Sequence, residues 1–165
     1  MKIKKLIEDL NLASKLEYSM QPLRNEDIPL AWAIRKAAAE RFNVIDESSL
    51  GLYKLNINIS DEFERVKIRG DKQLMLRAFV NLIGNSIRHN PNGCEIYITA
   101  KIEKNAAYIN FSDSGRGIPK EIADVVNFNK ASSNHVMGLI IVKKIITAHN
   151  GKMSIGKGIS IKFHV

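Results

Sequence analysis

The spacing of apolar residues along the chain predicts alternating helices and strands. Apolar positions three or four residues apart are typical of a helix with one buried side, and apolar–polar alternation is typical of a strand with one buried face. On these criteria we expect helices at residues 1–18, 27–42, 71–90, 121–126 and 138–149. Strands are expected at residues 20–23, 52–59, 94–102, 106–112, 152–155 and 159–165, with a short one within 63–69.

The order of these elements predicts an α+β fold, a two-layer α/β sandwich with helices on one face of a mixed, largely antiparallel sheet. Two pairs of strands, joined around Lys104-Asn105 and Gly156–Gly158, are predicted hairpins. With 165 residues, the chain has room for one domain. We expect that domain to occupy residues 19–165 and to hold Trp32 in its core.

The helix expected at residues 1–18 carries an apolar stripe. The stripe comprises Ile3, Leu6, Ile7, Leu10, Ala13 and Leu16. A short helix of this kind is marginal in water unless another surface covers its stripe. We expect that surface to belong to a partner, and the alternative is that residues 1–18 fold back on their own domain.

The helix at residues 71–90 separates apolar from polar positions on a helical wheel. Its apolar side comprises Leu76, Phe79, Val80, Ile83 and Ile87, and its polar side comprises Arg77, Asn81, Asn85 and Arg88. An Asn side chain offers a neutral carbonyl oxygen, which suits a Mg²⁺ ion that is bound alongside phosphates. Arg88 and His89 could meet phosphate oxygens of the same ligand. The alternative is an ordinary amphipathic helix whose Asn residues are exposed.

Two loops carry further candidate ligand groups. Asp113 follows a predicted strand and can accept a hydrogen bond from a ligand amine, and Gly115 and Gly117 permit close backbone approach and positive φ. Gly138 opens a helix whose N-terminal N–H groups form a natural anion site. The alternative for Asp113 is a buried structural role. Residues 119–137, between these loops, include a polar and unpatterned stretch, and we expect them to form a mobile lid.

Composition narrows the class of ligand. The net charge of +8 and the pI near 9.6 suit an anionic ligand such as a nucleotide, and also nucleic acid or an anionic membrane surface. No Lys/Arg run is dense and few aromatic residues lie among the basic ones, so we expect no binding of nucleic acid. The single cysteine, Cys94, fits a reducing cytoplasm. The sequence shows no signal peptide or membrane-spanning apolar run, so we expect a cytoplasmic chain without membrane contact of its own.

Taken together, these motifs resemble those of sensor histidine kinases. Asn81 and Asn85 resemble the N box, the run from Asp113 through Gly117 to Ile118 resembles the G1 box, and Gly138-Leu139 resembles the G2 box. Gly158-Ile-Ser160 resembles a remnant of the last glycine box. The motifs follow the order that the family has, and the resemblance covers nearly the whole chain.

The resemblance implies a Bergerat-type ATP-binding fold with ATP and Mg²⁺ as ligands. It assigns Mg²⁺ to Asn85, helped by Asn81, and the phosphates to Arg88, His89 and the helix start at Gly138. It also implies that Asp113 accepts a hydrogen bond from the adenine amino group. The remaining nucleotide contacts are assigned to Gly115, Gly117, Ile118, Leu139 and Ser160.

The resemblance also implies that the γ-phosphate of ATP passes to a histidine on a dimerisation helix, where an acidic residue follows the histidine. None of His89, His135, His149 and His164 is followed by Asp or Glu. We therefore expect the acceptor outside this chain, and little self-phosphorylation. Residues 1–18 resemble the end of the second dimerisation helix. The implied partners are the protein's own dimerisation and phosphotransfer domain, a response regulator and a second copy in a homodimeric, membrane-bound sensor.

Several positions depart from the family pattern. Asn81 stands where related ATPases carry a Glu that activates water, and an amide cannot take a proton, so we expect slow hydrolysis at best. Val136 replaces a usual glycine of the G2 box, and Phe128 is the only phenylalanine of the expected lid. These departures leave open a degenerate nucleotide-binding or scaffolding pseudokinase domain, and also a basic interaction module that binds no nucleotide.

Overall fold

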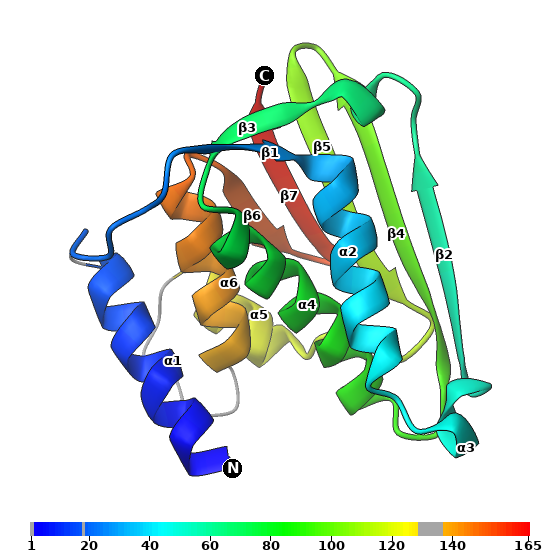
Figure 1. Cartoon of the computed structure of the whole chain (residues 1–165). Helices are drawn as coiled ribbons and strands as arrows, with labels where there is room; N and C mark the ends of the chain where they lie inside the picture. Colours follow the sequence, from blue (N-terminus) through cyan, green and yellow to red (C-terminus); the bar gives the residue numbers. More distant parts are fainter. Residues whose placement is uncertain (1, 18, 129–136) are drawn as a thin grey trace.

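The computed structural model describes residues 2–17, 19–128 and 137–165, and it has two layers (Figure 1). One layer is a five-stranded sheet, and helices that cover one face of it form the other. The helices are α1 (Lys2–Glu17), α2 (Leu30–Asn43), α3 (Glu47–Leu50), α4 (Lys72–His89), α5 (Lys120–Asn127) and α6 (Met137–Ala148). The strands are β1 (Glu26–Pro29), β2 (Tyr53–Ile59), β3 (Lys67–Gly70), β4 (Cys94–Glu103), β5 (Ala106–Asp113), β6 (Lys152–Ile155) and β7 (Ile159–His164), and a 3₁₀ turn, η1, spans Phe63–Arg65. The predicted α+β fold class is confirmed.

The main sheet has the strand order β2-β4-β5-β7-β6. β2 runs parallel to β4, with Tyr53 opposite Cys94, and the other neighbouring strands are antiparallel. Lys104 and Asn105 join β4 to β5 with φ angles of 49° and 62°. Two successive positive φ angles are what a two-residue hairpin loop needs to match the twist of its strands. Both predicted hairpins, β4–β5 and β6–β7, are confirmed.

The core lies between the sheet and three helices, α2, α4 and α6. Alternate residues of β4 and β5, such as Ile98 and Phe111, are buried. α4 lies between α2 and α6 (Figure 1), and its Phe79 ring lies 5.6 Å from the Phe111 ring, centroid to centroid. Because neighbours cover α4 on three sides, most of its apolar residues are buried and its polar groups are confined to the outward side and the C-terminal end.

The expected strand at residues 20–23 is wrong. The strand near the N-terminus is instead β1, which pairs antiparallel with β3 in a separate two-stranded sheet. Ile28 of β1 is fully buried. Since the pairing partner is distant in the sequence, local patterning does not indicate which residues of this region form the strand.

The expected core position of Trp32 is also wrong. Its side chain is 40% exposed, and Lys72 Nζ lies 5.2 Å from the ring centroid. α2 instead buries the small residues Ala33 and Ala37 together with Ile34. Small residues at a helix contact let two helices approach closely, which leaves the largest side chain of α2 at the rim.

α1 packs against α6, so residues 2–17 fold back on the domain in this structure (Figure 1). Its inner side buries Leu12 and Ala13 together with Asp9, which forms an ion pair with Arg77 of α4. The opposite side leaves Ile3, Ile7 and Leu10 exposed, at 71%, 53% and 45%. A partner for these three residues, and the domain boundary after residue 18, stay predictions. Within the described residues, no helix combines the length and apolar character needed to cross a bilayer.

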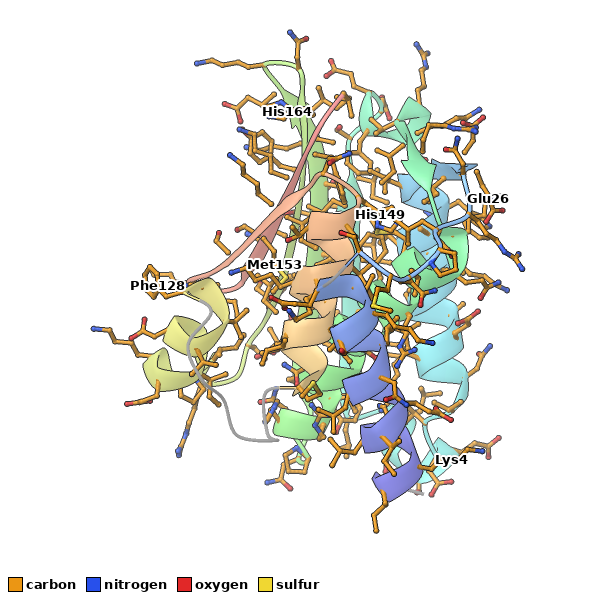
Figure 2. The ribbon with its side chains drawn as sticks, turned by 90° about the vertical axis from the view of Figure 1, so that its left-hand side faces the viewer. Lys4, Glu26, Phe128, His149, Met153 and His164 are labelled. Carbon is orange, nitrogen blue, oxygen red and sulfur yellow. The ribbon has the colours of Figure 1, made fainter. Side chains whose placement is uncertain are left out.

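His149 follows the end of α6 and is labelled in Figure 2. Its imidazole contacts α6, the end of β3 and the start of α4. Its Nε2 accepts a hydrogen bond from the Asp71 N–H at 3.0 Å, and its Nδ1 therefore donates to the Ile145 carbonyl at 2.7 Å. A Cβ on Gly70 would lie 2.1 Å from the imidazole, so only glycine fits beneath the ring. Asp71 in turn accepts from the Leu74 N–H and caps α4. His149 thus positions the start of the helix that carries the candidate site.

Candidate functional site

A cavity of about 420 Å³ opens at the C-terminal end of α4. It lies between α4, the end of β5, the loop that leads to α5, the first turn of α6 and the β6–β7 turn. Seven of the residues to which the sequence analysis assigned a ligand contact line it: Asn85, His89, Asp113, Gly115, Gly117, Ile118 and Leu139. The two glycine-bearing loops and the central helix, which are distant in the sequence, therefore meet around one space.

Asp113 ends β5 and starts the turn that forms one wall. Its Oδ1 accepts a hydrogen bond from the Gly115 N–H at 2.8 Å. A carboxylate has about four lone-pair sites, so Asp113 retains acceptor capacity for a ligand amine. A Cβ on Gly115 would lie 2.1 Å from Asn90 Oδ1. Gly117 has a φ of 78°, and among the described residues a Cβ there would come within 4.0 Å of the Lys157 carbonyl oxygen alone. The positive φ favours glycine at position 117, whereas a side chain at position 115 would require the Asn90 side chain to shift.

The inner wall of the cavity is apolar. Ile118 and Leu139 contribute to it, as expected. Further apolar residues line the cavity to which the sequence analysis assigned no ligand contact, among them Phe111, Ile122 and Ile159. Strand alternation indicates that Phe111 and Ile159 point inward, but it does not indicate that they lie at the cavity end of the sheet. A space lined by apolar side chains, beside a carboxylate, suits an aromatic ring that carries an amino group.

Asn85 lies on the opposite wall and is 9% exposed. Its Oδ1 accepts a hydrogen bond from an Arg88 guanidinium nitrogen at 2.6 Å. A carbonyl oxygen has two lone pairs, so Asn85 can still ligate a cation. In the described part of the chain, no three His, Cys, Asp or Glu side chains are grouped as a metal site. A hard cation here would depend on Asn85, on water and on oxygens of the ligand, which is the manner of Mg²⁺ beside phosphates.

His89 faces the cavity beside Asp113. Burial lowers the pKa of the His89 imidazole, the neighbouring Arg88 lowers the pKa further, and the Asp113 carboxylate opposes both effects. The neutral imidazole is therefore favoured. A phosphate placed near His89 would add negative charge and shift the pKa back upward.

Four predicted residues do not line the cavity. Asn81 lies one turn before Asn85 and is half-buried, and Arg88 is exposed on the outward side of α4. Gly138 is the second residue of α6, and a Cβ there would meet nothing within 4 Å among the described residues. Ser160 is exposed on β7, on the sheet face turned away from the helices, between two buried neighbours. Their roles towards a nucleotide stay predictions.

The expected lid is described only in part. α5 confirms the short helix expected around residues 121–126. Figure 2 shows Phe128 just beyond the end of α5, on the side away from α1, and its side chain is 67% exposed. His135 and Val136, with the rest of residues 129–136, lie outside the described residues.

Known proteins with similar sequences and structures agree with this geometry. Residues 70–165 match the family described as histidine kinase-, DNA gyrase B- and HSP90-like ATPases. The sensor histidine kinase YvrG of Bacillus subtilis is 26% identical over 95% of this chain. The chain spans only 28% of the length of YvrG.

Two solved structures have the same fold. The Acinetobacter baumannii histidine kinase AdeS matches with a TM-score of 0.72 and 20% identity, over 98% of this chain and 77% of AdeS. The histidine kinase ThkA, solved in complex with the response regulator protein TrrA, matches with a TM-score of 0.67 and 18% identity, over 99% of this chain and 48% of ThkA. The family match covers the second half of the chain, including every residue of the cavity, and the fold agrees along nearly its whole length. The chain therefore belongs to the histidine kinase-, DNA gyrase B- and HSP90-like ATPase family.

Proposed function

We propose that this chain is the ATP-binding catalytic domain of a two-component sensor histidine kinase, which passes the γ-phosphate of ATP to a histidine outside residues 1–165. The observation that carries the proposal is the cavity in which Asp113 and its glycine turn face Asn85 of the central helix. The similarity to YvrG and AdeS supports a kinase rather than another ATPase of the family.

Each wall of the cavity has a separate task in this proposal. Asp113 accepts a hydrogen bond from the adenine amino group, and Ile118 and Leu139 exclude water from the faces of the ring. Asn85 directs its carbonyl oxygen to the cation that accompanies the phosphates. When bound, Mg²⁺ offsets charge on the phosphate oxygens during transfer. The cavity volume of about 420 Å³ lies within the usual range of small-molecule sites.

The absence of a base in the N box favours phosphoryl transfer over hydrolysis. Asn81 and Asn85 carry amides, and neither can take a proton from water. A site of this kind holds the nucleotide until a better nucleophile arrives. We propose that the nucleophile is a histidine of the protein's own dimerisation and phosphotransfer domain, and that a response regulator receives the phosphoryl group afterwards. The solved complex of ThkA with the response regulator protein TrrA supports a response regulator as a partner.

One observation favours a second candidate function, a pseudokinase domain that binds nucleotide without transferring phosphate. The Asn85 oxygen that would ligate Mg²⁺ accepts a hydrogen bond from the positively charged Arg88. A guanidinium that stays in this position would repel a divalent cation. Transfer of radiolabelled phosphate from ATP to a supplied histidine-bearing dimerisation domain separates the two functions.

A thermal melt with and without Mg·ATP, on the wild-type chain and on Asp113→Ala, tests nucleotide binding. A ligand present at 100 times its Kd stabilises the folded state by about 2.7 kcal/mol. We expect a clear rise in Tm for the wild-type chain and none for Asp113→Ala. If neither protein responds to any nucleotide, the proposal is wrong.

A further inference from the structure

The outward side of α4 contains a glycine in the middle of the helix. Arg77, Asn81, Gly84 and Arg88 follow one another at spacings of four, three and four residues, so they share that side. Glycine inside a helix destabilises it by about 1 kcal/mol relative to alanine. The neighbouring residues of α4 do not explain Gly84, and its role must depend on what lies against it.

Gly84 allows Arg41 of α2 to lie across α4. A Cβ built on Gly84 would lie 2.8 Å from Arg41 Nε and 3.4 Å from Arg41 Cδ. The contact brings a guanidinium from the last turn of α2 onto the outward side of the central helix. Any larger residue at position 84 would push that guanidinium away.

The Arg41 side chain has no hydrogen bond or ion pair within the part of the chain that the structure describes. Arg35, on the same helix, instead forms a two-point contact with Glu64, and one of its bonds measures 2.9 Å. Arg77 on α4 pairs with Asp9. The position of Arg41 is therefore not explained by an internal acidic partner.

Arg88 lies one helical turn after Gly84, where residues at this spacing are about 5–6 Å apart. It reaches Asn85, which lines the cavity. Arg41, from α2, thus lies against Gly84, and Arg88, on α4 itself, lies one turn further along the same helix and bonds the cavity-lining Asn85. Two guanidinium groups in this arrangement suit a phosphate, which each can meet with two parallel hydrogen bonds.

We propose that Arg41 binds the distal phosphates of the nucleotide beside Arg88, and that Gly84 is present to admit it. This inference rests on the proposed function, because it needs a nucleotide in the cavity. In this arrangement the third phosphate makes the main contact with Arg41 and Arg88. The site then binds ATP more tightly than ADP. Adenosine lacks phosphates, so its affinity does not depend on Arg41.

Calorimetric titration of Arg41→Ala with Mg·ATP, Mg·ADP and adenosine tests the inference. A hydrogen-bonded contact to a charged group corresponds to a loss of roughly 10-fold in affinity for ATP when one partner is removed. We expect a smaller loss for ADP and none for adenosine. Arg35→Ala is the matched control, since it removes the same charge from the same helix at a site facing Glu64, and it should leave all three affinities unchanged.

Gly84→Ala provides a second variant, which keeps the guanidinium but displaces it. We expect the loss of ATP affinity seen in Arg41→Ala, with an unchanged or higher Tm because alanine favours the helix. The double variant should lose no more than either single one, since both remove the same contact.

The possible results of these titrations separate failure of the inference from failure of the proposed function. Unchanged ATP affinity in Arg41→Ala would overturn the inference, and so would an equal loss in Arg35→Ala, which would indicate a general effect of surface charge. Failure of the wild-type chain to bind any of the three ligands would instead remove the proposed function itself.

Discussion

The end of the cavity around Asp113 and the end around Asn85 are formed by different kinds of structural elements. The Asp113 end consists of a strand terminus, a turn with glycines at 115 and 117, and apolar side chains, and the hydrogen bond from Gly115 to Asp113 holds the turn. The Asn85 end consists of polar side chains on helices, and Arg88 is exposed to solvent. The first end is set by backbone shape, whereas long side chains set the second.

This difference separates recognition of the base from recognition of the phosphates. A rigid, apolar slot with one acceptor excludes ligands of the wrong shape before binding, and it loses little freedom when it is filled. Long cationic side chains can follow a phosphate chain and a cation, but they must be ordered on binding. We therefore expect substitutions at the two ends to differ in which ligands they affect.

The largest effect is expected at the Asp113 end. Asp113→Ala removes the proposed acceptor for the adenine amino group and the bond that holds Gly115. We expect about a 100-fold loss of affinity, equal for adenosine and ATP, because both carry the base. Titration calorimetry measures this loss. Unimpaired adenosine binding would mean that the base does not lie against Asp113.

The next effect is expected at the Asn85 end. Asn85→Ala removes the proposed cation ligand, and we expect affinity for ATP to fall by about 10-fold in Mg²⁺. The same variant should match the wild-type chain when EDTA removes the metal, and its affinity for adenosine should be unchanged. A loss that is equal for all three conditions would point to damage to the fold and would remove the distinction between the two ends.

Stability provides a third comparison, between two glycines. Gly117 has a φ of 78°, so Gly117→Ala should lower the free energy of unfolding by about 1–2 kcal/mol through backbone strain. Gly138→Ala is the matched control, since Gly138 is helical and a Cβ there meets no described atom within 4 Å. Urea unfolding measures both variants. Equal stability of the two would contradict a Gly117 turn that is set by backbone shape.

The smallest effect concerns His89, which faces Asp113 from the helix. The pKa of His89 is lowered from 6.5 in the folded state, first by burial and then by Arg88. The unfolded chain then binds the proton more readily, so the contribution of His89 to stability is fully present above about pH 6.5 and is lost as pH falls through the lowered value. His89→Gln should lose less stability than the wild-type chain between about pH 7 and about pH 5. Parallel urea-unfolding profiles would show that His89 carries no such contribution.

Local patterning predicted most elements because they follow from short-range periodicity. The central helix, both hairpins and the α5 helix are confirmed, since each has its own periodicity or turn residues. β1 was not found, because its pairing with β3 is made across a long stretch of chain. Trp32 was misplaced, because burial on α2 depends on how closely α4 approaches.

In the candidate site, too, some features were predicted from the sequence and others were not. Asp113, Gly115 and Gly117 were identified as one turn from their spacing, and the structure brings them together. Asn81 and Asn85 share a side of the wheel, yet only Asn85 lines the cavity. The residues lie one turn apart along the axis, and the wheel does not show how far along the helix the cavity extends.

The sequence by itself determined the two-layer architecture, the turn at Asp113 and the polar side of the central helix. These features depend on φ preferences, on periodicity and on residues close together in the chain. Only the tertiary structure decided that Arg41 lies over Gly84, that Arg88 holds the oxygen of Asn85, and that Asp9 pairs with Arg77. The first and last of these contacts join different helices, whose packing depends on every side chain between them. No local pattern carries that information.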